Sequence, residues 1–270
     1  VNGPQGTLFG RNTTGGAVIL TPAVPTDKLE GYVQLEAGNF RDRAIEAVVN
    51  VPVSSTLALR FAGHRQTRKG FTRDIVVGTD YDNKDYEYGR ASALWKPTDR
   101  LENLTVGYYS KSRSNGTGNV AGVYNVPFYN GTFAAVGGCA GVGLGTNCSV
   151  LTDLTAAQAA RGPRRIALGQ GALGNTRVIG WGVTNRTSYE LTDNLAIRNI
   201  ASISHLRARV FYDPDGSLFF LNGGPNRQSH VWPDSYKQYT EELQLQGDAA
   251  DRKVQYTFGV YYERVKTDRE

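Results

Sequence analysis

The chain has 270 residues, of which 40% are hydrophobic and 20% charged, and its formal net charge is +5. It contains no apolar run of about 18 residues, which excludes a transmembrane helix but not a β-barrel, whose strands alternate apolar and polar residues. The positive charge permits nucleic-acid binding, but the lysines and arginines are interleaved with acidic residues, so we expect no nucleic-acid partner.

The N-terminal stretch is dominated by residues that favour turns. Five glycines and one proline fall within the first sixteen residues, and both residue types oppose a helix interior. The stretch therefore predicts tight turns that lead into a short strand from Ala17 to Thr21. The residues that carry its pattern are Gly3, Pro4, Gln5, Gly6, Thr7, Leu8, Gly10, Arg11, Asn12, Gly15, Gly16, Ala17, Val18 and Ile19.

This pattern resembles the C-terminal part of the plug domain of TonB-dependent outer-membrane receptors, which carry GPQGTLYGRN-x-x-GG-x-I-N-I just before their barrel begins. The departures are small: Asn2 stands where the family usually has arginine, and Leu20-Thr21-Pro22 replaces the commoner I-T-K. The resemblance implies that residues 1–25 are the end of a plug and that residues 26–270 are the N-terminal part of a 22-stranded barrel. We therefore expect the chain to be a fragment.

Beyond Pro22, short alternating segments predict about nine strands, each long enough to cross a bilayer at a tilt. The last segment is the clearest, with Val254, Tyr256 and Phe258 on one face and Gln255 and Thr257 on the other. The expected strands cover 31–39, 43–51, 57–67, 86–95, 104–112, 178–191, 195–211, 238–247 and 253–266.

Short and long connections alternate along the predicted strands. Short turns fall at 52–55, 97–101, 192–194 and 248–252, and long polar loops fall at 68–85, 113–177 and 212–237. This arrangement is typical of an antiparallel up-and-down transmembrane β-barrel, which keeps its turns on one side and its loops on the other. The fold class is therefore all-β: a partial barrel preceded by the tail of a plug.

Aromatic residues near the strand ends suit the two girdles of such a barrel. Trp95 lies close to a short turn and suits the inner girdle, whereas Tyr108 and Tyr109 lie close to a long loop and suit the outer one. The alternative is that these residues are simply good β-formers.

The long segment 113–177 has a different composition. It contains one helical pattern at 152–161, and it holds Cys139 and Cys148 on either side of a glycine-rich loop. Two cysteines allow one pairing, so we expect a disulfide in an oxidising compartment. A metal site is not expected, because the segment has no CxxC motif and no nearby histidine.

The remaining motifs indicate no enzyme and no cofactor. Residues 169–174 fit G-x-G-x-x-G but lack the flanking strand and helix that a dinucleotide site needs. Residues 213–217 resemble half of a calcium loop without its closing glutamate. His64, His205 and His230 are far apart in the sequence, and no catalytic constellation can be assigned.

A plug inside a polar lumen is held by hydrogen bonds and ion pairs, and in the resembled family plug arginines meet barrel glutamates. We therefore expect Arg11 to pair with Glu242 or with Glu46. The alternative is that Arg11 bonds to carbonyl groups of the plug itself.

Two later segments also resemble the receptor family: 240–245, Thr-Glu-Glu-Leu-Gln-Leu, and 256–262, Tyr-Thr-Phe-Gly-Val-Tyr-Tyr. The resemblance implies a receptor in the outer membrane, surrounded by its lipid and energised by the TonB complex through an N-terminal region not included here. The ligand expected is a ferric siderophore. Passive porins and structural surface proteins are the rival interpretation, but they do not account for residues 3–20.

An anionic ligand would match the basic residues near the predicted outer loops, although scattered solvated charge explains them equally well. The sequence identifies no ligand-contacting residue. The basic residues concerned are Arg65, Arg68, Lys69, Arg73, Lys111 and Arg113.

Overall fold

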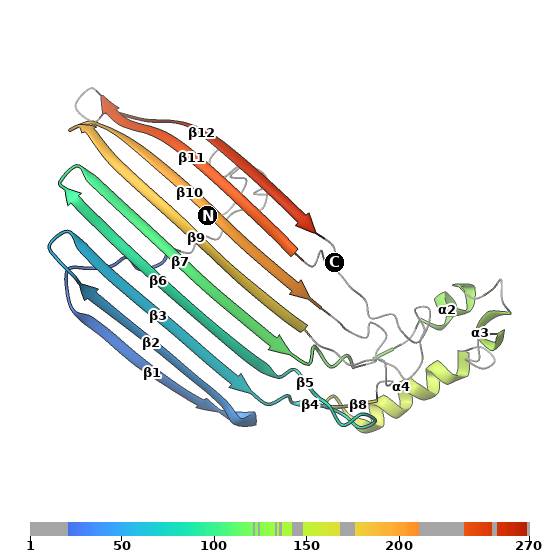
Figure 1. Cartoon of the computed structure of the whole chain (residues 1–270). Coiled ribbons are helices and arrows are strands. Elements are labelled where there is room, and N and C mark those ends of the chain that lie inside the picture. The colour runs from blue at the N-terminus through green and yellow to red at the C-terminus, as the bar shows by residue number, and fades with distance from the viewer. Residues whose placement is uncertain are drawn as a thin grey trace.

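The computed structural model describes residues 21–120, 122–123, 125–132, 134, 137–141, 148–167, 176–210, 235–249 and 253–268. Most of these residues form one nine-stranded antiparallel sheet, in which each strand pairs with the strand that precedes it in the sheet (Figure 1). Its strands are β1 (Glu30–Gly38), β2 (Asp42–Pro52), β3 (Leu57–Arg68), β6 (Lys84–Thr98), β7 (Leu101–Ser114), β9 (Thr176–Thr192), β10 (Leu195–Arg209), β11 (Ser235–Ala249) and β12 (Val254–Asp268).

The predicted partial barrel is confirmed as an open sheet whose two edges are β1 and β12. The expected strands agree with the observed ones to within a few residues, since alternating side chains suit a pleated surface with two different faces. The largest differences are three residues: β7 and β11 each begin three residues before the predicted start, and β6 ends three residues after the predicted end.

The strand register divides the side chains into two faces, because directly paired residues point to the same side. We call inner the face that carries Asn50, because residues 26–28 lie against it. The buried Asn50 side chain accepts a hydrogen bond from the Thr26 amide at 2.9 Å and donates to the Thr26 and Lys28 carbonyls at 2.9 and 2.6 Å. This amide thus fixes how the chain enters the sheet.

The opposite face, called outer, is apolar and exposed over much of its area. On β1, Val33 and Leu35 are 65% and 74% exposed. Trp95 and Tyr109 also lie on this face. The prediction that Tyr108 belongs to an aromatic girdle is wrong. Its register partners, Arg90 and Gly182, lie on the inner face, so Tyr108 lies there as well.

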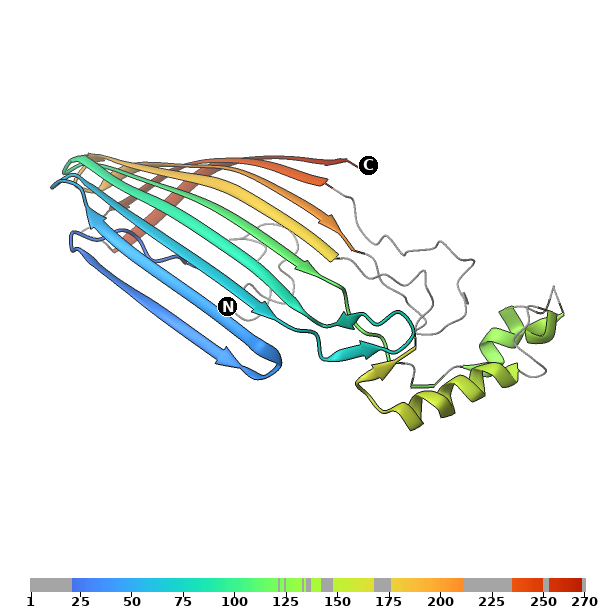
Figure 2. The ribbon, with the colours of Figure 1, turned by 60° about the horizontal axis from the view of Figure 1, so that its bottom comes forward.

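The connections fall into two groups at opposite ends of the sheet. The turns at 53–56, 99–100, 193–194 and 250–253 define what we call the turn end. The connections at 39–41, 69–83, 115–175 and 210–234, of which all but the first are long, define the loop end. The loop end carries the helices α2 (Val126–Thr132), α3 (Gly138–Gly141) and α4 (Ser149–Arg161), which extend beyond the sheet (Figure 2). Within the described part of the chain, no helix combines the length and apolar character needed to cross a membrane.

A small second sheet joins two of the long connections, which the sequence had indicated as loops. It consists of β5 (Asp80–Tyr81), β4 (Thr72–Asp74) and β8 (Arg165–Ile166), and β4 pairs with β8 in parallel. Tyr81 and Ile166 are almost fully buried between these strands. The buried Gln158 of α4 donates hydrogen bonds to the Gly162 and Arg165 carbonyls, both at 2.9 Å, so the helix is tied to the small sheet.

Cys139 and Cys148 form a disulfide in the structure. Both are fully buried and pack with Leu151, which gives the helical segment a core of its own. Helix α4 begins at Ser149, three residues before the predicted start, and ends before Gly162, whose φ of +81° suits a glycine.

Candidate functional site

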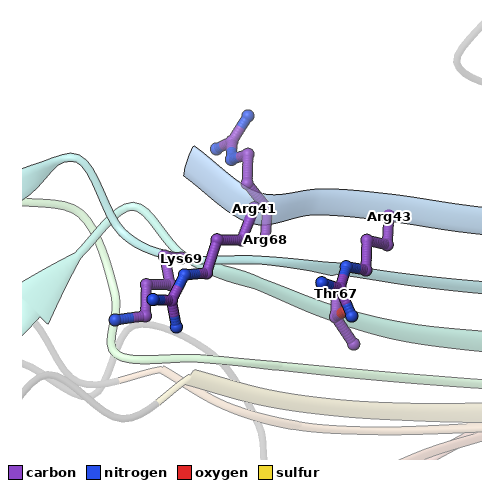
Figure 3. Close-up of a pocket in the computed structure, with 5 residues that line it drawn as sticks. All are labelled: Arg41, Arg43, Thr67, Arg68 and Lys69. Atoms are coloured by element: carbon purple, nitrogen blue, oxygen red, sulfur yellow. The ribbon is translucent and has the colours of Figure 1, made fainter. Parts of the chain in front are cut away.

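The loop end holds a pocket lined by four cationic side chains. Its volume is about 360 Å³, and its lining residues come from the connection between β1 and β2, from the start of β2, and from the end of β3 and the residue that follows it (Figure 3). They are Arg41, Arg43, Thr67, Arg68 and Lys69.

Local backbone geometry brings these residues together. Phe40 and Arg41 both adopt positive φ angles, 59° and 57°, so the first connection turns sharply. The Lys69 amide then donates to the Phe40 carbonyl at 2.9 Å, which links the end of β3 to this turn. Arg43 and Thr67 are direct register partners on neighbouring strands.

Two phenylalanine rings pack together beside the basic pocket, one from the connection 39–41 and one from the connection 69–83. The Phe40 and Phe71 rings lie 5.7 Å apart, and the Arg68 guanidinium lies 5.1 Å from the centre of the Phe71 ring. Arg68 also donates from Nη2 to the Asp82 carbonyl at 2.8 Å. Its Nε is buried and has no hydrogen-bond partner among the described residues.

The six cations suggested by the sequence separate into three groups. Arg65 pairs with Asp85, Lys111 pairs with Glu87 at 2.6 Å, and Arg73 pairs with Asp80 at 2.8 Å, so these three charges are balanced locally. Arg68 and Lys69 do line the pocket, whereas Arg113 lies on the outer face. Sequence reasoning missed Arg41 and Arg43, which the register of the first hairpin would have revealed.

The inner face below the loop end is polar and aromatic. Tyr32 donates from its hydroxyl to Glu46 at 2.6 Å, and His64 Nδ1 lies 3.5 Å from the second oxygen of the same carboxylate. The His64 and Tyr86 rings are 5.8 Å apart. This arrangement can bind a polar ligand, but it contains no nucleophile placed beside a base.

The predicted contacts of Arg11 with Glu242 or Glu46 depend on a residue, Arg11, that lies outside the described part of the chain. The plug motif from Gly3 to Gly16, and with it Arg11, belongs there, as do residues 169–174, 213–217 and His230. Glu46 and Glu242 both face inward, but they belong to the second and eighth strands in the sheet order. Contacts of Arg11 with one or the other are therefore alternatives, and both stay predictions.

Among the described residues, no cluster of three or more histidine, cysteine, aspartate or glutamate side chains could hold a metal ion. The pocket at the loop end presents positive charge. Guanidinium and ammonium groups bind carboxylates and other anionic oxygens through charge-assisted hydrogen bonds.

Comparison with known proteins identifies solved structures that share this fold. No protein-family model matches the chain. The ferric yersiniabactin uptake receptor FyuA of Yersinia pestis superposes over 98% of the chain, with a TM-score of 0.71 and 16% identity. The ferric-catecholate import receptor Fiu of Escherichia coli K12 in its open form gives a TM-score of 0.69 over 98% of the chain at 16% identity. The siderophore receptor PiuA of Acinetobacter baumannii gives 0.66 over 98% at 15%.

These likenesses show a shared fold, since the identities are low. The chain spans 35%, 38% and 34% of the lengths of FyuA, Fiu and PiuA. The resemblance to barrel receptors that the sequence indicated is thus confirmed at the level of the fold.

Proposed function

We propose that the chain is part of a TonB-dependent receptor of the outer membrane that takes up a ferric siderophore. The observation that carries the proposal is the superposition of almost the whole chain on FyuA and Fiu, which import ferric yersiniabactin and ferric catecholates. The plug-like motif at residues 3–19 supports it independently. In this proposal residues 1–25 end the plug and residues 26–270 begin the barrel.

The basic pocket supports an anionic ligand. Arg41, Arg43, Arg68 and Lys69 line one pocket at the loop end, where an arriving ligand first contacts the protein. Ferric siderophores present carboxylate, phenolate or catecholate oxygens, which cationic side chains attract over a distance before contact. The pocket would hold such a ligand while the plug, pulled by the TonB complex, controls its passage.

Binding measurements on the intact receptor test the proposal. We expect a ferric catecholate siderophore to bind, and cobalamin and a neutral glycan not to bind. In Arg41→Gln/Lys69→Gln the affinity should fall about tenfold or more, because two charge-assisted contacts are removed. The matched control Arg100→Gln/Lys253→Gln removes two positive charges at the turn end and should bind normally.

Two results would contradict this proposal in different ways. Preference for the neutral ligand would remove the argument from charge. Uptake that continues in cells without the TonB complex would indicate a passive porin instead.

A further inference from the structure

The turn between β1 and β2 has an unusual sequence for its backbone. The Asp42 amide donates to the Asn39 carbonyl, and the two residues between them, Phe40 and Arg41, have φ angles of 59° and 57°. Two successive positive φ angles are the backbone of a type I′ turn, in which Asn-Gly is the preferred pair. Bulky side chains make this backbone unfavourable. Contacts outside the turn must therefore hold Phe40 and Arg41 in this conformation.

The Phe40 ring makes such contacts on two sides. It lies 5.7 Å from the Phe71 ring, and the Arg164 guanidinium lies 5.4 Å from its centre. Arg68 lies over Phe71 in the same way, at 5.1 Å. Each guanidinium is within the range of a cation–π interaction. We call the four residues Arg164, Phe40, Phe71 and Arg68, which follow one another in this order, the ring clamp.

The partners of Phe40 in the ring clamp belong to segments that backbone hydrogen bonds fix. The Phe71 amide donates to the Tyr81 carbonyl at 3.1 Å, and the Arg73 amide donates to the Arg164 carbonyl at 2.8 Å. Arg164 directly precedes β8, which pairs with β4. The ring clamp therefore attaches the tip of the first hairpin to both of the long connections 69–83 and 115–175.

Arg41 is the pocket residue whose position this attachment controls. It follows Phe40 in the turn and lines the basic pocket together with Arg68 and Lys69 (Figure 3). No described residue forms an ion pair or a hydrogen bond with the Arg41 side chain. An Asn-Gly turn would form more easily but would place no charge at the pocket. An unfavourable backbone enforced by its surroundings is typical of functional positions.

We propose that Phe40 is a positioning residue for anion recognition: its ring, held between Phe71 and Arg164, keeps Arg41 in place at the basic pocket before the ligand arrives. A mobile arginine would have to be ordered during binding, which lowers the affinity. The inference rests on the proposed function, because it takes the basic pocket as the anion site. It adds Phe40 and Arg164, which do not line the pocket, to the residues that determine binding.

The first test replaces Phe40 by asparagine in the intact receptor in lipid nanodiscs. Asparagine accepts a positive φ readily, so Phe40→Asn keeps the turn and removes the ring. The probe is the anionic complex of Fe³⁺ with three catecholate ions. We expect its affinity to fall about two- to tenfold, which is the effect of ordering one long side chain on binding. The midpoint of denaturant unfolding should stay the same, because the easier backbone offsets the lost ring contacts.

The conservative variant Phe40→Tyr keeps a ring at this position and should bind the complex normally. A merely structural role of Phe40 would lower the midpoint and the affinity together in Phe40→Asn. Unchanged affinity in Phe40→Asn would overturn the proposal.

A double-mutant cycle shows whether Phe40 acts through Arg41. In a receptor that already carries Arg41→Gln, the further change Phe40→Asn should leave the affinity unaltered, because no arginine remains to be positioned. The same fold-loss with and without Arg41 would overturn the proposal.

A mobility measurement tests the ring clamp without any ligand. A nitroxide spin label on Asn39→Cys, an exposed position at the start of the turn, reports the motion of the turn by electron paramagnetic resonance. Cys139 and Cys148 are bonded to each other and do not react with the label. We expect slow motion with Phe40 and fast motion with Phe40→Asn. Equal mobility would overturn the proposal, whereas failure of the unmodified receptor to bind the catecholate complex would contradict the proposed function.

Discussion

Gly182 is an inner-face glycine at which an added side chain would have little room. The Tyr108 ring of the neighbouring strand lies over it, and a Cβ at position 182 would be 2.7 Å from Tyr108 Cε1. We predict that Gly182→Ala lowers the free energy of unfolding by about 1–3 kcal/mol, because the ring must move out of a packed position. The midpoint of denaturant unfolding in lipid vesicles measures this change.

Gly89→Ala is the matched control for this substitution. Gly89 also lies within a strand, but nothing is within 4 Å of the position a Cβ would take. Alanine there should leave the midpoint unchanged or raise it slightly, since glycine is the more flexible residue in the unfolded chain. Combining Gly182→Ala with Tyr108→Leu should recover part of the loss. Equal midpoints for the two alanine variants would show that Tyr108 does not restrict position 182.

A cluster of four polar side chains crosses β7 and β9 on the outer face toward the turn end. Asn103 donates to Asn185 at 3.2 Å and to Thr187 at 2.7 Å, and Asn185 donates to Asn103 at 3.2 Å and to Thr105 at 2.7 Å. Polar groups that face lipid must be hydrogen-bonded to one another, because lipid offers no substitute for water. The four side chains therefore act as one unit.

We predict that Asn185→Leu alone lowers the free energy of unfolding by about 1–3 kcal/mol, because it leaves the remaining polar groups without partners. Replacing all four residues, as Asn103→Leu/Thr105→Val/Asn185→Leu/Thr187→Val, should cost less than the single change, since no unsatisfied group remains. Denaturant midpoints in vesicles compare the two. A larger loss in the fourfold variant would show that these residues contribute independently.

This polar element also shows where sequence reasoning reached its limit. The alternation of apolar and polar residues located the nine strands, because successive side chains of a strand point to the apolar outer face and the polar inner face in turn. On β7, however, Leu104 and Tyr108 are the apolar set and face inward, while Asn103 and Thr105 face outward. A single strand cannot reveal which of its faces is the outer one; that depends on the register with its neighbours.

The loop end was harder to predict for the same reason. Strands β4, β5 and β8 are three, two and two residues long, too short for a periodic signal. They form because residues near 73 and 165 pair across a long separation in sequence. The basic pocket likewise joins Arg41 with Lys69, and only the hairpin register brings them together.

At the scale of the whole molecule, the open sheet has two edges, β1 and β12. An edge strand pairs with a neighbour on one side only, so some of its backbone amides have no hydrogen-bond partner within the sheet. We predict that amide hydrogen exchange, followed by mass spectrometry on the 270-residue chain in detergent, is fastest in β1 and β12 and slowest in β7 and β9. The central strands should exchange at least tenfold more slowly, because opening them requires breaking hydrogen bonds on both sides.

The helical segment provides an internal reference for this experiment. Its disulfide-linked core does not depend on the sheet edges, so exchange in α4 should be the same whether or not the edges are covered. If β1 and β12 were protected as strongly as β7, with α4 unchanged, the prediction of open edges would be wrong. That outcome would mean that further strands, from this chain or from another molecule, pair with both edges, as closure of a barrel requires.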